Sequence, residues 1–114
     1  MSGYLTTHVL DTARGLPAAG LKITLYRVTG HDREALVQMV TNADGRTNSP
    51  ILPAEEFAIG TYELVFEAGA YLRGMGLSDG FLDIVPLHFK MTEAAHYHVP
   101  LLLSPFGYST YRGS

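Results

Sequence analysis

Histidine is the side chain of this sequence that is best suited to acid–base chemistry at neutral pH. Its imidazole has an ordinary pKa near neutral pH, and the chain contains five histidines and no cysteine. His96 and His98 lie two residues apart in HYHVP, so they share one face of a predicted strand. His8 follows two threonines in TTHVLD, at the start of another predicted strand. Periodicity alone does not separate a catalytic role for these residues from that of ordinary strand histidines.

No metal or cofactor is expected from these residues. Zinc needs three or four ligands, and no carboxylate or further histidine is spaced near His96 and His98. The absence of cysteine excludes disulfides, a thiolate nucleophile and a thiolate-ligated metal. The sequence also has no Gly-rich phosphate loop, no serine nucleophile elbow and no pair of carboxylates placed for acid–base work.

The other charged candidates have ordinary interpretations. His31 lies in the charged connection TGHDREA and His88 on the polar face of a strand, so both are expected at the surface. Arg46 directly follows the tight-turn pair Asp44-Gly45, where a solvated residue of a β-hairpin is the common outcome. The residue types alone therefore leave a group of histidine and arginine candidates without a defined reaction.

The segments that must position these residues are strands, because apolar side chains recur with a period of two. LKITLYR, TYELVFE and PLHFKMT each place three apolar side chains on one face. EALVQMVT is a fourth candidate, although its apolar residues fall on both faces. The expected strands and their buried residues are 21–27 (Leu21, Ile23, Leu25), 61–67 (Tyr62, Leu64, Phe66) and 86–92 (Leu87, Phe89, Met91).

Turn segments rich in Gly, Pro, Asn and Asp separate these strands, as in RGLPAAG, NADGRTNSP and PAEEFAIG. Only AGAYLRGMG is typical of a helix, with residues 70–75 as its expected extent. Seven or eight short strands, without helices to cover a parallel sheet, predict an antiparallel β-sandwich in a single domain of residues 1–114. Pro100 cannot donate to a strand ladder, which predicts an edge strand or a bulge at that position.

Composition argues against several classes of partner. The net charge is -3 with eight Lys and Arg, whereas nucleic-acid phosphates need a concentrated basic face. No apolar run reaches the ~18 residues of a membrane span. The start, MSGYLTTHVLD, has no basic leader followed by an apolar stretch. We expect a cytoplasmic protein that binds neither nucleic acid nor membrane.

At its two ends the sequence resembles the transthyretin-like family of 5-hydroxyisourate hydrolases, enzymes of urate breakdown. The resemblance rests on THVLDTARGLPAAGLKITLYRV at the start and HYHVPLLLSPFGYSTYRGS at the end. The middle agrees in TNADGR and GTYELVFEAGAYL, so the resemblance spans nearly the whole chain. The closing Tyr-Arg-Gly-Ser is its most specific feature, because transthyretin itself does not end in this way.

The resemblance implies an all-β, transthyretin-like antiparallel β-sandwich of two four-stranded sheets with one short helix. It also implies a homotetramer. Edge strands pair to form dimers, and two dimers meet face to face. The active sites would then lie at the dimer–dimer interface, each lined by residues from two subunits.

The resemblance also implies which residues form the site. The family's catalytic positions fall on His8 in TTHVLD, Arg46 in DGRT and His98 in HYHVP, which leaves His96 as a bystander. The carboxylate of Ser114 is expected to be a fixed anion in the pocket wall, and the Tyr111 side chain to narrow the channel that transthyretin leaves open. The family's terminal, substrate-binding tetrapeptide falls on Tyr111, Arg112, Gly113 and Ser114.

The implied reaction is the metal-free hydrolysis of the N1–C6 bond of 5-hydroxyisourate to 2-oxo-4-hydroxy-4-carboxy-5-ureidoimidazoline. A neutral imidazole would take a proton from water, and Arg46 would stabilise the charge on the carbonyl oxygen. The sequence leaves open whether His8 or His98 is the base. The alternative function is a transthyretin-like carrier of a small hydrophobic or hormone-like ligand. The polar trio argues against a carrier, because an apolar channel has little use for these groups.

Overall fold

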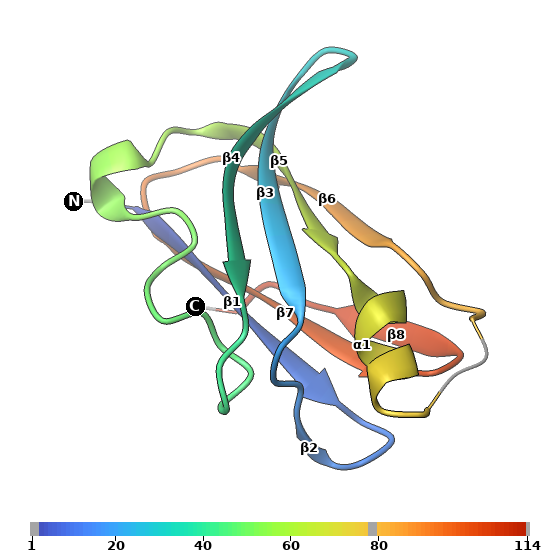
Figure 1. Ribbon diagram of the computed structural model, residues 1–114. Coiled ribbons are helices and arrows are strands. Elements are labelled where there is room, and N and C mark those ends of the chain that lie inside the picture. Colours follow the sequence, from blue (N-terminus) through green and yellow to red (C-terminus); the bar gives the residue numbers. More distant parts are fainter. Residues whose placement is uncertain (1–2, 78–79, 114) are drawn as a thin grey trace.

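Two four-stranded β-sheets pack face to face with a layer of apolar side chains between them (Figure 1). The computed structural model describes residues 3–77 and 80–113. The expected sandwich of two four-stranded sheets with one short α-helix is confirmed. The elements are β1 (Tyr4–Asp11), β2 (Leu16–Pro17), β3 (Lys22–Thr29), β4 (Asp32–Val40), the 3₁₀ helix η1 (Ala54–Glu56), β5 (Gly60–Phe66), α1 (Ala68–Gly74), β6 (Val85–Met91), β7 (His96–Ser104) and β8 (Gly107–Thr110).

The first sheet has the strand order β2-β1-β7-β8 and the second β4-β3-β5-β6. Strands β1 and β7 are parallel, whereas the other strand pairs in the described residues are antiparallel. The sandwich is thus antiparallel as predicted, except at this one pair. Because β1 and β7 are joined through the entire second sheet, no short hairpin forces them to run in opposite directions.

The strands bury the faces that the period of two predicts. In β3 and β5, the side chains of Ile23, Leu25, Tyr62, Leu64 and Phe66 are completely buried between the sheets. Val65, on the opposite face of β5, is buried as well, because Thr24 of β3 and Pro86 of β6 flank it on that face. The fourth predicted strand forms β4, an edge strand that is mostly exposed on both faces.

Helix α1 begins two residues before the predicted 70–75 and ends one residue before it. The chain leaves the helix through Gly76, whose φ of 67° is in the left-handed region that glycine tolerates. The buried Tyr71 hydroxyl donates a hydrogen bond of 2.8 Å to the Asp11 carboxylate at the end of β1. This bond ties the helix to the strand that carries His8. Among the described residues, no helix has the length and apolar character needed to span a membrane.

Pro100 lies in β7, an inner strand, so the prediction of an edge position was wrong. The predicted irregularity is confirmed, because β8 ends at Thr110, opposite Leu101. Pairing resumes only at an isolated bridge between His98 and Gly113. Proline has no N–H to donate toward this neighbour, and the Thr110 hydroxyl instead donates to the Pro100 carbonyl at 2.6 Å.

Candidate active site

The rings of His8 and His98 lie next to each other on the outer face of the first sheet. Strand β1 is directly beside β7 (Figure 1), and their parallel register sets Thr6 opposite His98 and His8 opposite Pro100. The two ring centroids are 6.2 Å apart. Residues at even positions of both strands face outward, whereas Leu5, Val9 and their neighbours at odd positions enter the core. The sandwich therefore brings together two histidines that lie ninety residues apart.

Arg46 is held beside β1 by the turn that precedes it. The backbone of Arg46 forms an antiparallel bridge with that of His8. The Asn42 side chain accepts hydrogen bonds from the backbone N–H groups of Asp44 and Arg46, at 2.9 and 3.2 Å. Gly45 has a φ of 75°, and a Cβ there would collide with the Val9 carbonyl. The predicted tight turn is confirmed, and it delivers Arg46 to the strand that carries His8.

The surroundings keep both histidines neutral. Burial and the positive charge of Arg46 lower the pKa of His8 from its ordinary value of 6.5, although a hydrogen bond to the Asp44 backbone opposes this effect. Burial, Arg46 and the neighbouring histidines lower the pKa of His98 in the same way. At neutral pH each imidazole therefore has one unprotonated ring nitrogen, which is the form that a general base requires.

Thr6 was missed by sequence reasoning, although it touches the candidate site most directly. Its hydroxyl oxygen is 2.8 Å from Nδ1 of His98 and 2.7 Å from Nε2 of His96. His96, expected to be a bystander, is thus linked to His98 through a single hydroxyl. The ring of His96 is also stacked on Tyr4 at 4.1 Å, with 5° between the planes. The period of two places Thr6 on the face of His8, but only the register of β1 against β7 sets it opposite His98.

A small cavity adjoins these residues. Its volume is about 210 Å³, and Thr6 and Arg46 both contribute to its wall. The remaining wall comes from Thr7 and from residues 47–50, which continue the loop after Arg46. The wall is therefore rich in hydroxyl and amide groups. Within the described residues, no group of three or more His, Asp or Glu side chains could hold a metal ion.

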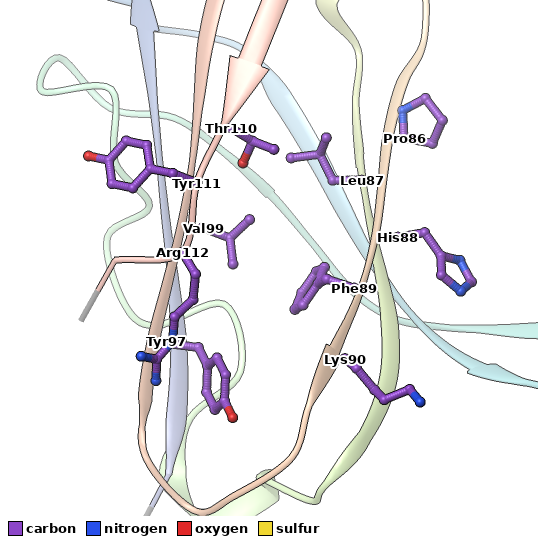
Figure 2. Close-up of a pocket in the computed structure, with 10 residues that line it drawn as sticks. All are labelled: Pro86, Leu87, His88, Phe89, Lys90, Tyr97, Val99, Thr110, Tyr111 and Arg112. Carbon is purple, nitrogen blue, oxygen red and sulfur yellow. The ribbon is translucent and has the colours of Figure 1, made fainter.

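The terminal residues are distributed over both faces of the first sheet. The backbones of Gly113 and His98 are hydrogen-bonded to each other, so Gly113 lies directly beside the histidine pair. Figure 2 shows a cavity between β6 and β8, and the Tyr111 side chain points away from it. Tyr111 therefore points toward the outer face of the first sheet, the face on which His98 lies. Tyr111 is 59% exposed. Ser114 lies outside the described residues.

Arg112 points to the opposite face. Its guanidinium carbon lies 4.5 Å above the ring centroid of Tyr97. Both residues line a cavity of about 310 Å³ between β6 and β8 (Figure 2). Within one chain, Arg112 is thus separated by the sheet from the two histidines.

The fold defines a transthyretin-type sandwich, and the outer face of its first sheet carries histidine with arginine beside it. A solved structure of sea bream transthyretin in complex with thyroxine has a TM-score of 0.87 and 27% identity, and the match covers 96% of this chain and 93% of that one. The profile of the HIUase/Transthyretin family matches residues 5–113. The chain belongs to this family.

Two relatives are similar to this chain over almost their whole length. The 5-hydroxyisourate hydrolase of Mesorhizobium japonicum is 62% identical, with 98% of this chain and 93% of the relative covered. The 5-hydroxyisourate hydrolase 2 of Rhizobium meliloti is 58% identical, with 99% and 98% covered. The structure of (S)-allantoin synthase has a TM-score of 0.92 and 44% identity over 99% of this chain, which spans only 44% of that longer chain.

Proposed function

We propose that this protein hydrolyses 5-hydroxyisourate. Two members of its family that are named 5-hydroxyisourate hydrolase are 62% and 58% identical to it over nearly the full length. The observation that carries the proposal is the placement of His8 and His98 side by side, with Arg46 bridged to the strand of His8. A hydrolysis without a metal needs a neutral base and a cation at one place, and this face supplies both.

The reaction is ring opening by water. One imidazole takes a proton from a water molecule as its oxygen attacks C6 of the substrate, and the C6 oxygen becomes negatively charged. The Arg46 guanidinium stabilises that oxygen with charge-assisted hydrogen bonds. The N1–C6 bond then breaks, and the imidazolium returns its proton to N1. C6 becomes the carboxyl carbon of 2-oxo-4-hydroxy-4-carboxy-5-ureidoimidazoline, and this carboxyl group loses its remaining proton to water.

We further propose that the active form is a homotetramer in which a second subunit completes the site. Strands β6 and β8 end their sheets and flank the same side of the sandwich, so their free edges are available for pairing with a second copy. The cavity beside Arg46 is about 210 Å³ in one chain, below the ~300–1,000 Å³ of ordinary ligand sites. The outer face that carries His8, His98 and Tyr111 would meet a second dimer.

In this assembly Tyr111, Gly113 and Ser114 contribute to substrate binding, and Arg112 holds the terminal segment on Tyr97. The role of Gly113 is supported by the hydrogen bonds between its backbone and that of His98. The role of Arg112 is supported by the contact of its guanidinium with the face of the Tyr97 ring. Sedimentation that finds a fully active monomer at assay concentration would contradict the tetramer.

A stopped-flow assay tests the proposed reaction. Urate oxidase generates 5-hydroxyisourate in the observation chamber, and the decay of the absorbance of 5-hydroxyisourate is followed with and without this protein. We expect decay much faster than the spontaneous reaction and proportional to protein concentration. A rate equal to that of the buffer control would contradict the proposed function. Calorimetric titration with thyroxine, the ligand in the sea bream structure, would then test the carrier alternative.

A further inference from the structure

The Thr6 hydroxyl joins two histidine rings that cannot both accept its single proton. Its oxygen is 2.7 Å from Nε2 of His96 and 2.8 Å from Nδ1 of His98. A hydroxyl has one proton to donate, and a neutral imidazole has one donor and one acceptor nitrogen. The hydroxyl oxygen has two lone pairs and can accept from both rings, but it can donate to only one of them. When both hydrogen bonds form, at least one ring must therefore donate to Thr6.

If both rings donate to Thr6, the proton of His98 is on Nδ1 and its Nε2 is a lone pair. If one ring donates and the other accepts, two directions of the hydrogen-bond chain exist, and they give His98 opposite chemistry. In the first, His98 donates its Nδ1–H to Thr6 and Thr6 donates to Nε2 of His96. Nε2 of His98 is then a lone pair that can accept a proton. In the second, His96 donates to Thr6 and Thr6 donates to Nδ1 of His98. The proton of His98 is then on Nε2, and this nitrogen cannot act as a base.

We propose that Thr6 and His96 are positioning residues that hold His98 with its proton on Nδ1, which makes Nε2 of His98 the general base. The proposal rests on the proposed function and identifies the base in it. When Nε2 takes a proton from water, the resulting imidazolium still needs an acceptor for its Nδ1–H. The first direction of the hydrogen bonds provides this acceptor without any rearrangement, because the Thr6 oxygen already accepts from His98.

The three residues are held in place by the strands. The parallel register sets Tyr4 opposite His96 and Thr6 opposite His98, so the contacts are fixed by backbone pairing. Stacking at 4.1 Å and 5° between Tyr4 and His96 fixes the plane of the His96 ring. A hydrogen bond to the second nitrogen is the usual means by which a protein selects one imidazole tautomer. Sites carried on strands hold such geometry better than sites on loops.

Nuclear magnetic resonance tests the tautomer without any substrate. In the ¹⁵N-labelled full-length protein at pH 8, two-bond ¹H–¹⁵N correlations distinguish a protonated ring nitrogen from an unprotonated one. The His98→Asn spectrum assigns the signals of His98. We expect protonated Nδ1 and unprotonated Nε2 in the wild type. The opposite pattern would overturn the proposal, whatever the activity of the protein.

Kinetics on two Thr6 variants test the consequence. Thr6→Val keeps the β-branched shape and removes the hydroxyl, whereas Thr6→Ser keeps the hydroxyl. We expect kcat to fall about tenfold in Thr6→Val with KM nearly unchanged, and Thr6→Ser to recover most of the loss. Thr29→Val, at the exposed end of β3 in the other sheet, is the matched control. Equal kcat in Thr6→Val and the wild type would overturn the proposal.

His96 variants test the direction of the hydrogen bonds between His98, Thr6 and His96. The Gln side chain of His96→Gln can still accept a hydrogen bond from Thr6, whereas the ring of His96→Phe keeps its shape beside Tyr4 but accepts nothing. We expect His96→Gln to retain more kcat than His96→Phe. If the wild type does not hydrolyse 5-hydroxyisourate, the proposed function fails while the resonance experiment still tests the tautomer. The reverse order of the two variants would contradict the proposed direction.

Discussion

The backbones of His98 and Gly113 exchange two hydrogen bonds, with N to O distances of 3.2 and 2.6 Å. Strand β8 has already ended at this point, so the bridge is a separate attachment of the terminal segment to β7. A Cβ at Gly113 would lie 3.3 Å from both Cβ and Cδ2 of His98. Glycine at this position therefore lets the backbone pass close to the imidazole.

We expect Gly113→Ala to lower the activity about tenfold with little loss of stability, because the new methyl group must push the His98 ring aside. Gly107→Ala is the matched control in the same segment, since a Cβ there would meet only the Ser104 hydroxyl, at 3.8 Å. The comparison uses kcat and the melting temperature of both variants. Equal activity of the two would mean that the close approach to His98 has no part in the reaction.

We expect His8→Asn and His98→Asn each to reduce turnover by about 10²–10⁴-fold, the usual contribution of a general acid or base. Both side chains lie on the outer face of their strands and are partly exposed, so an amide of similar size fits without a cavity. Stopped-flow rates, with circular dichroism to verify the fold, measure the effect. Near-normal turnover in either variant would exclude that histidine from the chemistry.

The rate should depend on pH through these two histidines. Because burial and Arg46 lower the pKa of both side chains in the free protein, the acid limb of kcat/KM should lie below the ordinary value of 6.5. In Arg46→Gln the missing charge lets both pKa values rise, so the limb should move to higher pH while kcat/KM at pH 8 falls. A pH profile of kcat/KM in the two proteins checks this. A flat profile from pH 5 to 8 would contradict a histidine base.

The same pKa shifts affect stability. Below pH 6.5 the unfolded chain binds protons at His8 and His98 before the folded protein does, since their folded pKa values are lower. The free energy of unfolding should therefore decrease as the pH falls from 6.5 through the folded pKa values. Urea unfolding at pH 8, 7, 6 and 5 measures the slope, and the double variant His8→Asn, His98→Asn should reduce it. An unchanged slope in the double variant would show that other groups cause it.

The link between helix and sheet can be tested separately from catalysis. Asp11 is completely buried and accepts hydrogen bonds from the Tyr71 hydroxyl at 2.8 Å and from the Arg14 backbone at 3.1 Å. Burial and the Asp11 carboxylate raise the pKa of Tyr71 to about 12, so the hydroxyl remains a donor at any working pH. We expect Tyr71→Phe to lower the free energy of unfolding by about 1–3 kcal/mol.

The activity of folded Tyr71→Phe should remain that of the wild type, because Tyr71 lies on α1 and contacts the end of β1. Tyr108→Phe is the control for loss of a hydroxyl, since Tyr108 is 45% exposed on β8. Denaturant unfolding of both variants gives the comparison. Equal stability of the two would mean that the bond to Asp11 contributes nothing.

The sequence predicted the parts of this fold that depend on local pattern. Alternation identified the buried faces of β3 and β5, and Asp44-Gly45 identified the turn that carries Arg46. It could not predict that β1 and β7 run parallel, because strand register depends on contacts between distant segments. For that reason the proximity of His8 to His98 rested on family resemblance. Thr6, which has no unusual neighbours in sequence, was not recognised as the link between His96 and His98.

The pairing of β1 with β7 also has a consequence for how the protein is made. Thr7 of β1 bonds to Val99 of β7, 92 residues later in the chain. At the usual ~5–20 residues per second, the ribosome needs roughly 5–20 s to deliver that partner. Throughout this interval the edge of β1 that pairs with β7 has no partner, although the strands of the second sheet emerge before β7. Non-local pairing of this kind is slow and exposes the nascent chain to aggregation, and the face that carries His8 and His98 forms only after β7 has emerged.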